Sequence, residues 1–424
     1  MGATASAADD GVRKRLLWFT LLATVFDGAE LTLLSYFFPN LARDFHVGIP
    51  AIVAVNTLQG LCSVAGGLLF GPIGDRMGRR TTMAVTVFLY GVATLAGGFV
   101  HSLAAFTLSR AVAGFGIGGE FGAAFATFSE VWQGRARGLM GAMVQNMFVV
   151  GIVVTTVVGF VAVRAGGLEP WRPAFMVVGA LTLLVCLAVL LWMPESPLWR
   201  AYDAARRAGQ LPPDLRRCGS PAAVFGAGLA ATTLLGMLVA SGAFYANYSL
   251  VLFEPTILLN HYHLAPAAET ALLLAGFAAL FAGSLLAGGL SDRLGRRAGV
   301  AIVAAIGVAA FFACWRTAGQ PYPGSLWGWG FGWSLLVANV GCGCIAVLGV
   351  WLGELYPTRL RATGENLVYY AGRGLGGSLL PLVAIAQLQD PGLALVLGGF
   401  GVGAAALAGL CVRETRGRRI VAVE

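Results

Sequence analysis

Long hydrophobic stretches separated by short polar segments follow one another along the whole chain. An α-helix needs roughly 20 apolar residues to cross the hydrocarbon core of a bilayer, and twelve of the stretches are about that long. The predicted spans are residues 16–39, 50–72, 82–101, 104–128, 138–163, 173–193, 222–253, 266–290, 298–318, 324–352, 363–388 and 391–412. The pattern therefore predicts an all-α membrane protein with twelve transmembrane helices.

The basic residues between these spans predict the orientation. Twelve spans place both termini on the same side, and if that side is the cytoplasm the inner segments hold 22 Lys and Arg residues. The outer loops then hold four, which are Arg43, Arg164, Arg172 and Arg316. Cytoplasmic loops of membrane proteins carry an excess of Lys and Arg, so we expect both termini to be cytoplasmic. The strong preference for arginine over lysine is typical of a GC-rich bacterium, and we place the protein in the inner membrane.

Composition excludes the main soluble classes. Hydrophobic residues make up 58% of the chain and charged residues 11%, whereas a soluble domain carries roughly 25% charged residues. The net charge of +8 predicts no nucleic-acid partner, because the arginines lie in short loops rather than on one basic face. The expected surroundings are a lipid bilayer.

Two motifs occur twice, in the same order. GPIGDRMGRR at 71–80 and GGLSDRLGRR at 288–297 each follow a hydrophobic run, and their aspartates are 217 residues apart. The form E-x4-R-x-R follows each of them, starting at Glu130 and at Glu354. A repeat of nearly half the chain predicts two homologous six-helix halves. The expected boundaries are 1–193 for the first half, 194–221 for a cytoplasmic linker and 222–424 for the second half.

These motifs resemble those of the major facilitator superfamily, and the resemblance covers nearly the whole chain. G-x3-D-R-x-G-R-R between helices 2 and 3 and again between helices 8 and 9 is similar to the loop signature of that superfamily. PESPLWR at 194–200 and ELYPTRLRATG at 354–364 resemble the branches of sugar porters and of proton symporters for aromatic acids, sialate and other metabolites. DGAE at 27–30 is similar to the DGxD of the organic-acid symporters, with Glu30 at the second acidic position. The resemblance implies a monomer that works by alternating access.

Acidic residues beside arginines at the inner helix ends predict a gate. Asp75 or Asp292 can meet a helix N-terminus or a neighbouring arginine, and the glycines let helices approach closely. We expect a charge network that latches the halves on the cytoplasmic side while the outside is open. The alternative is that these charges only set the topology. The predicted gating residues are Asp75, Arg76, Arg79, Arg80, Glu130, Glu195, Asp292, Arg293, Arg296, Arg297 and Glu354.

Ionisable residues inside the spans predict a proton pathway, because each costs roughly 2.5–3.5 kcal/mol on insertion scales. Asp27 and Glu30 are three residues apart and share one helix face. Two carboxylates so close in a low dielectric do not both ionise easily, which suits a proton carrier. The resemblance makes Arg110 their counter-charge, and a static buried salt bridge is the alternative. Glu120 is a second candidate proton site, or a structural residue.

Arg373 is the predicted substrate anchor. It lies about ten residues into its span with no acid nearby in the sequence, and a guanidinium group holds a carboxylate bidentately. The alternative is an ion pair with Glu254, Glu365 or a helix-1 acid. Other polar residues either line the cavity or form interhelical hydrogen bonds. Those predicted to bind substrate are Gln59, Gln145, Asn146, Asn247, Asn339 and Tyr369.

Together these features predict a proton-coupled importer of a small organic acid, such as a monocarboxylate or an aromatic acid. Its partners are protons and the organic anion, and the proton gradient takes the place of a cofactor. A sugar or polyol porter is the main alternative, because it shares several motifs. An exporter is disfavoured, since the glycine–proline pattern of drug antiporters is missing from 139–160. An enzyme or metal site is not expected, because all four histidines lie at the outer face, at or beyond the ends of the predicted spans. A membrane sensor is disfavoured because 194–221 is too short for a signalling domain.

Overall fold

The computed structural model describes residues 7–134, 136–165, 169–211, 220–226, 228–325, 328–381 and 391–418. Regular structure in these ranges is helical. The first part of the chain forms α1 (Ala7–Tyr36), α2 (Phe38–Asp44), α3 (Ile49–Met77), α4 (Arg79–Gly97), α5 (Leu103–Val131), α6 (Arg137–Arg164), α7 (Trp171–Trp192) and α8 (Pro197–Arg207). The predicted linker 194–221 thus contains a helix, and its residues 212–219 lie outside the described ranges.

The second part forms one further set of helices. These are η1 (Pro221–Phe225), α10 (Ala230–Asn260), α11 (Pro266–Leu294), α12 (Arg296–Thr317), α13 (Gly330–Cys342), η3 (Gly343–Ile345), α14 (Ala346–Leu355), η4 (Thr358–Leu360), α15 (Arg361–Gly372), the π-helical η5 (Arg373–Leu379) and α17 (Pro391–Cys411). Within the described ranges, nine helical segments are long and apolar enough to cross a membrane, with α13, η3 and α14 counted as one. α4, α15 with η5, and α17 bring the number of spans to twelve, as the hydrophobic pattern predicted.

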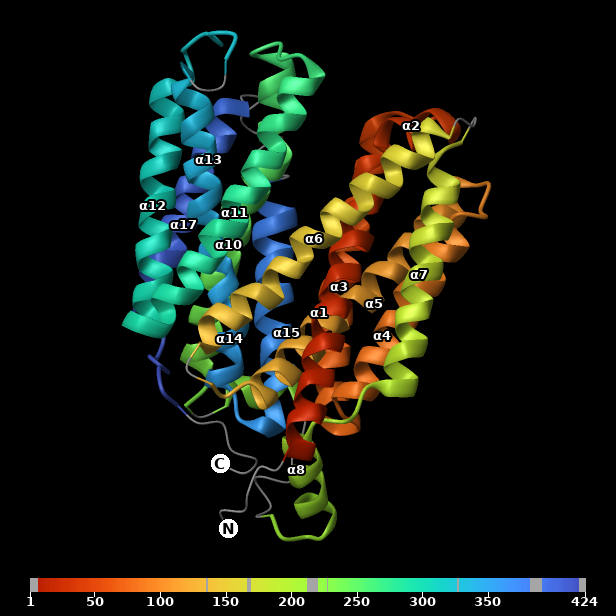
Figure 1. Ribbon diagram of the computed structural model, residues 1–424, viewed down its shortest axis with the longest axis vertical. Helices are drawn as coiled ribbons and strands as arrows, with labels where there is room; N and C mark the ends of the chain where they lie inside the picture. The colour runs from red at the N-terminus through yellow and green to blue at the C-terminus, as the bar shows by residue number, and fades with distance from the viewer. Residues whose placement is uncertain are drawn as a thin grey trace.

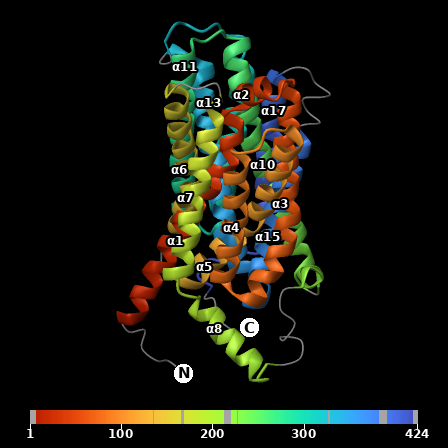
Figure 2. The same cartoon turned by 90° about the vertical axis from the view of Figure 1, so that its right-hand side faces the viewer.

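The helices gather into two groups, α1 to α7 and α10 to α17 (Figure 1). The ribbons diverge toward the end that carries α2 and come together toward the end that carries α8. The start of α1 lies at this second end, which we call the termini side (Figure 2). Contacts between the groups are made by α6 with α11 and α14, and by α15 with α3 and α5.

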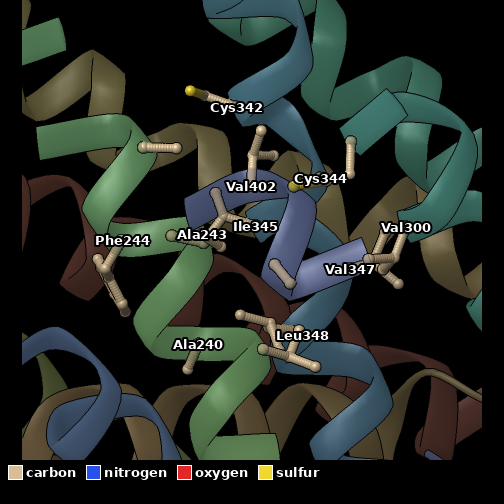
Figure 3. Packing of buried hydrophobic residues seen from close by; sticks show 14 of the residues in the cluster. Ala240, Ala243, Phe244, Val300, Cys342, Cys344, Ile345, Val347, Leu348 and Val402 are labelled. Atoms are coloured by element: carbon tan, nitrogen blue, oxygen red, sulfur yellow. The ribbon is translucent and has the colours of Figure 1, made fainter. Parts of the chain in front are cut away.

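Glycines determine how closely the helices pack. A Cβ atom on Gly66 of α3 would lie 1.9 Å from the carbonyl oxygen of Phe115, and one on Gly118 of α5 would lie 2.1 Å from that of Ser63. Only hydrogen fits at either place, so α3 and α5 touch backbone to backbone. In the second group, α10, α14 and α17 interdigitate small and branched side chains such as Ala240, Leu348 and Val402 (Figure 3).

The duplicated motif forms the same turn twice. Gly78 separates α3 from α4 with a φ of +102°, and Gly295 separates α11 from α12 with a φ of +108°. This backbone region is strained for residues with a Cβ atom, which explains the glycine in each D-R-x-G-R-R. The turn places Arg79 and Arg296 as the first residues of their helices.

Candidate functional site

A buried chain of hydrogen bonds joins Glu30 of α1 to Arg110 of α5. The Thr94 hydroxyl donates to a Glu30 carboxylate oxygen and accepts from Arg110 Nη2 at 2.9 Å. Thr182 of α7 also donates to Glu30, at 3.1 Å. Arg110 lies against the Phe175 ring, 4.9 Å from its centroid. The expected pair is therefore bridged by a threonine rather than joined directly. The two threonines were missed because a membrane-buried threonine is usually satisfied by its own helix, as Thr182 is at Val178 O.

Asp27 faces a different set of charges from Glu30. It is buried, and its Oδ1 has no hydrogen-bond partner among the described residues. Its charge interacts with Arg373 of the other helix group and with Glu120 of α5. Glu120 is buried as well, with an unbonded Oε1. The two helix-1 acids thus meet different arginines in this structure, Glu30 that of α5 and Asp27 that of η5.

Arg373 lies at the first residue of the π-helical turn η5 and is only 4% exposed. Its guanidinium group is 5.9 Å from the Tyr370 ring centroid, and its charge interacts with Tyr248 and Asp27. Within the part of the chain that the structure describes, no acid forms an ion pair with it. Single π-helical turns are frequent at functional sites, because the wider turn redirects side chains. A buried cation therefore faces a buried acid across the two helix groups without direct contact.

Aromatic side chains close this region. The rings of Phe121 (α5) and Tyr369 (α15) stack with centroids 3.4 Å apart. Phe244 of α10 meets Tyr369 edge-on at 4.9 Å, and the Gln145 side chain lies beside Tyr369. Tyr369 and Gln145 therefore lie together, as their prediction as substrate ligands requires. The stacked rings therefore lie beside Arg373, whose charge interacts with Tyr369.

The other polar residues predicted to bind substrate differ in burial and in hydrogen bonding. Gln59 is buried, and neither of its amide atoms has a partner among the described residues, while Asn247 is half-buried. Asn146 donates to Phe281 O of α11 at 3.1 Å, which is an interhelical bond. Asn339 donates to Leu335 O of its own helix at 3.1 Å. Asn146 thus links α6 to α11, whereas the Asn339 side chain is bonded within α13.

A buried charge cluster occupies the termini side. In the first half, Arg79 pairs with Asp75 at 3.0 Å and with Glu130 at 2.7 Å. The backbone N–H groups of Arg79 and Arg80 donate to Glu195, and the Ser196 hydroxyl donates to Glu130.

The second half repeats this arrangement. Arg296 pairs with Asp292 at 2.9 Å and with Glu354 at 2.7 Å. The backbone N–H groups of Arg296 and Arg297 donate to Glu414, and the Thr415 hydroxyl donates to Glu354. Glu414 and Thr415 were not among the predicted gating residues. The signal that could have found them is the pair Glu195–Ser196, which occupies the equivalent place after helix 6.

The halves exchange partners crosswise. Arg361 pairs with Glu130 at 3.0 Å, and Arg137 pairs with Glu354 at 3.2 Å. These arginines are the last residues of the two E-x4-R-x-R motifs. Their repetition in the sequence could have indicated that each takes part in the charge cluster.

The aspartates also cross between the halves. Asp75 accepts from the backbone N–H groups of Ala362 and Thr363 at the start of α15. Asp292 accepts from those of Gly138 and Leu139 at the start of α6. Both aspartates thus meet a helix N-terminus, as expected. Arg76 and Arg293 instead have exposed side chains.

Two six-helix groups with buried charges between them are the architecture of a secondary transporter. The Major Facilitator Superfamily model matches residues 20–381, and the chain belongs to this family. It is 25% identical to the niacin transporter NiaP of Acinetobacter baylyi, over 87% of this chain and 85% of that one. It is 25% identical to the cis,cis-muconate transport protein of the same organism (86% and 84%) and 24% identical to the sialic acid transporter NanX of Escherichia coli (88% and 86%).

A solved structure supports the same fold. The proton:xylose symporter XylE with bound 6-bromo-6-deoxy-D-glucose superimposes with a TM-score of 0.80 at 17% identity, over 97% of this chain and 98% of that one.

Proposed function

We propose that the protein is a proton-coupled symporter that takes up a small organic acid, such as a monocarboxylate or an aromatic acid. Arg373 carries the proposal: it is a buried guanidinium group, faces Asp27 across the two halves, and has no ion-paired acid in the described ranges. An unpaired charge in a membrane interior is costly, so a transported anion supplies the missing partner. Tyr369 and Phe121 provide the apolar wall for the rest of the substrate.

The named relatives support an acidic substrate. Niacin, cis,cis-muconate and sialic acid differ in size but share a carboxyl group, and relatives named for their transport match most of this chain. A sugar porter remains the alternative within the family, but a neutral sugar does not require an unpaired arginine. The likeness to XylE supports the fold only, because the identity is 17%.

Protons enter the mechanism through Asp27 and Glu30. When Asp27 is ionised, it attracts Arg373 and competes with the substrate carboxylate. Protonation of Asp27 removes that competition, so a proton and an anion bind together. Protonation of Glu30 also affects Arg110 through Thr94. Loss of the negative charge on Glu30 weakens the hydrogen-bond chain that joins these three residues.

We further propose that the termini side is cytoplasmic and that the charge cluster is the latch of the outward-facing state. All its crosswise bonds join the halves at that end, while the ribbons diverge at the other (Figure 1). Opening to the cytoplasm requires the four crosswise contacts of Arg137, Arg361, Asp75 and Asp292 to break.

Uptake by proteoliposomes tests the proposal. Labelled organic acids and sugars are offered with and without an inward proton gradient to the wild type, Arg373→Ala and the control Arg316→Ala, which removes an exposed arginine of the same half. We expect gradient-driven accumulation of a carboxylate, lost in Arg373→Ala and kept in Arg316→Ala. Accumulation of sugars alone, or of a carboxylate by Arg373→Ala, would contradict the proposal.

A further inference from the structure

Glu365 is a buried acid that the transport mechanism above leaves without a role. It lies one turn into α15 on the termini side and is 0% exposed. Neither of its carboxylate oxygens has a hydrogen-bond partner among the described residues. Its Oε1 lies 2.8 Å from the place that a Cβ atom on Gly353 would take, so the carboxyl group lies against the backbone at Gly353.

The arginines and carboxylates around Glu365 already form ion pairs with one another. Those that face it are Arg361 of its own helix, Arg79, Arg137, Glu130, Asp75 and the Tyr356 hydroxyl. Arg79 pairs with Asp75 and Glu130, Arg361 with Glu130, and Arg137 with Glu354. With the pairs of Arg296, these ion pairs join four guanidinium groups (Arg79, Arg137, Arg296 and Arg361) to four carboxylates (Asp75, Glu130, Asp292 and Glu354), and Glu365 is not among them. An ionised Glu365 would be an uncompensated buried charge, which protonation removes.

The repeat provides an internal comparison. Glu365 follows Arg361 by four residues, and the equivalent position after Arg137 is Gly141. Arg137 nevertheless forms the same crosswise ion pair, with Glu354, as Arg361 forms with Glu130. The cluster is therefore built in the other half without an acid at this position, so its architecture does not require Glu365.

We propose that Glu365 is a proton-binding site of the charge cluster, occupied while the cluster is closed and vacated when it opens. When the halves separate on the termini side, Arg361 loses Glu130 and needs a new partner. Glu365 is four residues away on the same helix, the spacing at which side chains meet. The O–H bond of Glu365 then breaks, the proton passes to water on that side, and the carboxylate pairs with Arg361. This inference rests on the alternating access of the proposed function.

The sign of the pH effect follows. The closed cluster holds one proton more than the open one, so raising the pH favours opening. One proton changes the ratio of open to closed molecules by at most about tenfold per pH unit.

Distances between spin labels on the two halves test this without substrate. Labels are attached to Met77→Cys and Leu294→Cys, which end α3 and α11 on the termini side and are 56% and 54% exposed. The background lacks the native cysteines and carries Asp27→Asn and Glu30→Gln, so that the two helix-1 acids do not contribute. Pulsed EPR measures the open fraction across pH in this protein and in its Glu365→Gln variant. Glu365→Ala serves if the glutamine variant does not fold.

We expect the open fraction to rise with pH when Glu365 is present, and Glu365→Gln to remove most of that slope and keep the cluster closed. Equal slopes in the two proteins, or a distance that does not change with pH when Glu365 is present, would overturn the assignment. A wild-type protein that moves no organic acid would refute the proposed function alone, because the EPR measurement involves no transport.

Discussion

At the scale of single residues, two acids three positions apart serve different partners. The spacing of Asp27 and Glu30 predicted a shared helix face, and α1 provides it. A single turn nevertheless directs Glu30 to Thr94 and Thr182, and Asp27 to Arg373 and Glu120. Spacing along a helix fixes which side chains are neighbours, but the helices opposite decide what each one meets.

Glu30→Gln is expected to weaken the coupling of protons to substrate. The neutral amide can still accept a hydrogen bond from Thr94 but cannot bind and release a proton, while Asp27 and Arg373 are unchanged. Gradient-driven accumulation should fall below the wild-type level, while substrate exchange persists. Counterflow and gradient-driven uptake measured side by side check this, and accumulation at the wild-type level would contradict it.

Equivalent glutamates in the two halves differ in their titration. Burial tends to raise the pKa of Glu414, but N–H donors from Arg296, Arg297, Arg416 and Thr415 outweigh it and hold the pKa below its ordinary value of 4.5. At Glu195 burial prevails over its N–H donors and raises the pKa. Ionised Glu414 therefore stabilises the fold at neutral pH, and that stability is lost as the pH falls through its lowered pKa.

Thermal unfolding across pH checks this difference. Glu414→Gln should lower the Tm at pH 7, with the gap to wild type closing toward pH 4 and below. Glu195→Gln should show the opposite trend, because ionisation of a group with a raised pKa reduces stability as the pH rises. Parallel pH profiles for the two variants would refute the assignment.

At the scale of elements, composition located the helices and glycines determine their contacts. The predicted spans match described helices to within a few residues for α5 and α7, because hydrophobic length is a local property. The start of α1 at Ala7, the separate α2 and the π-helical η5 were not predicted. They depend on capping and packing that a hydropathy pattern does not contain.

Gly118→Ala is expected to destabilise the contact between α5 and α3, because a Cβ atom there lies 2.1 Å from Ser63 O. The matched control is Gly289→Ala in α11, where no heavy atom lies within 4 Å of the added Cβ. Alanine favours a helix over glycine by about 1 kcal/mol, so the control should keep or raise the Tm. Gly118→Ala should lower it by several degrees, and equal effects would contradict the packing argument.

At the scale of the whole molecule, the duplicated motifs meet crosswise. Each half supplies an aspartate to the N-terminus of a helix in the other half and a glutamate to an arginine there. This exchange joins the two halves on the termini side, and under the proposed function it must break before that side can open.

A double-mutant cycle measures one of these links. Arg361→Ala and Glu130→Ala should each raise the open fraction on the termini side, since each removes the crosswise pair, and Glu130→Ala also leaves buried Arg361 without an ion-paired acid. In the double variant the change in the free energy of opening should be smaller than the sum of the changes in the two single variants. The difference, the coupling free energy, should be about 0.5–3 kcal/mol. Label distances between positions 77 and 294 give the populations, with the exposed Arg200→Ala as control. Additive effects would show that the pair does not latch the halves.

The sequence by itself determined the number of spans, the duplication and the charged motifs, because hydrophobic length and repeated motifs are properties of the chain alone. It also identified most residues of the charge cluster and of the region around Arg373. Only the tertiary structure decided that Thr94 bridges Glu30 to Arg110, that Asn146 links α6 to α11, and that Arg137 and Arg361 pair crosswise. Each of these contacts depends on which face of one helix meets another. The close packing of different helices determines that orientation, and a hydrophobic pattern along the chain does not contain it.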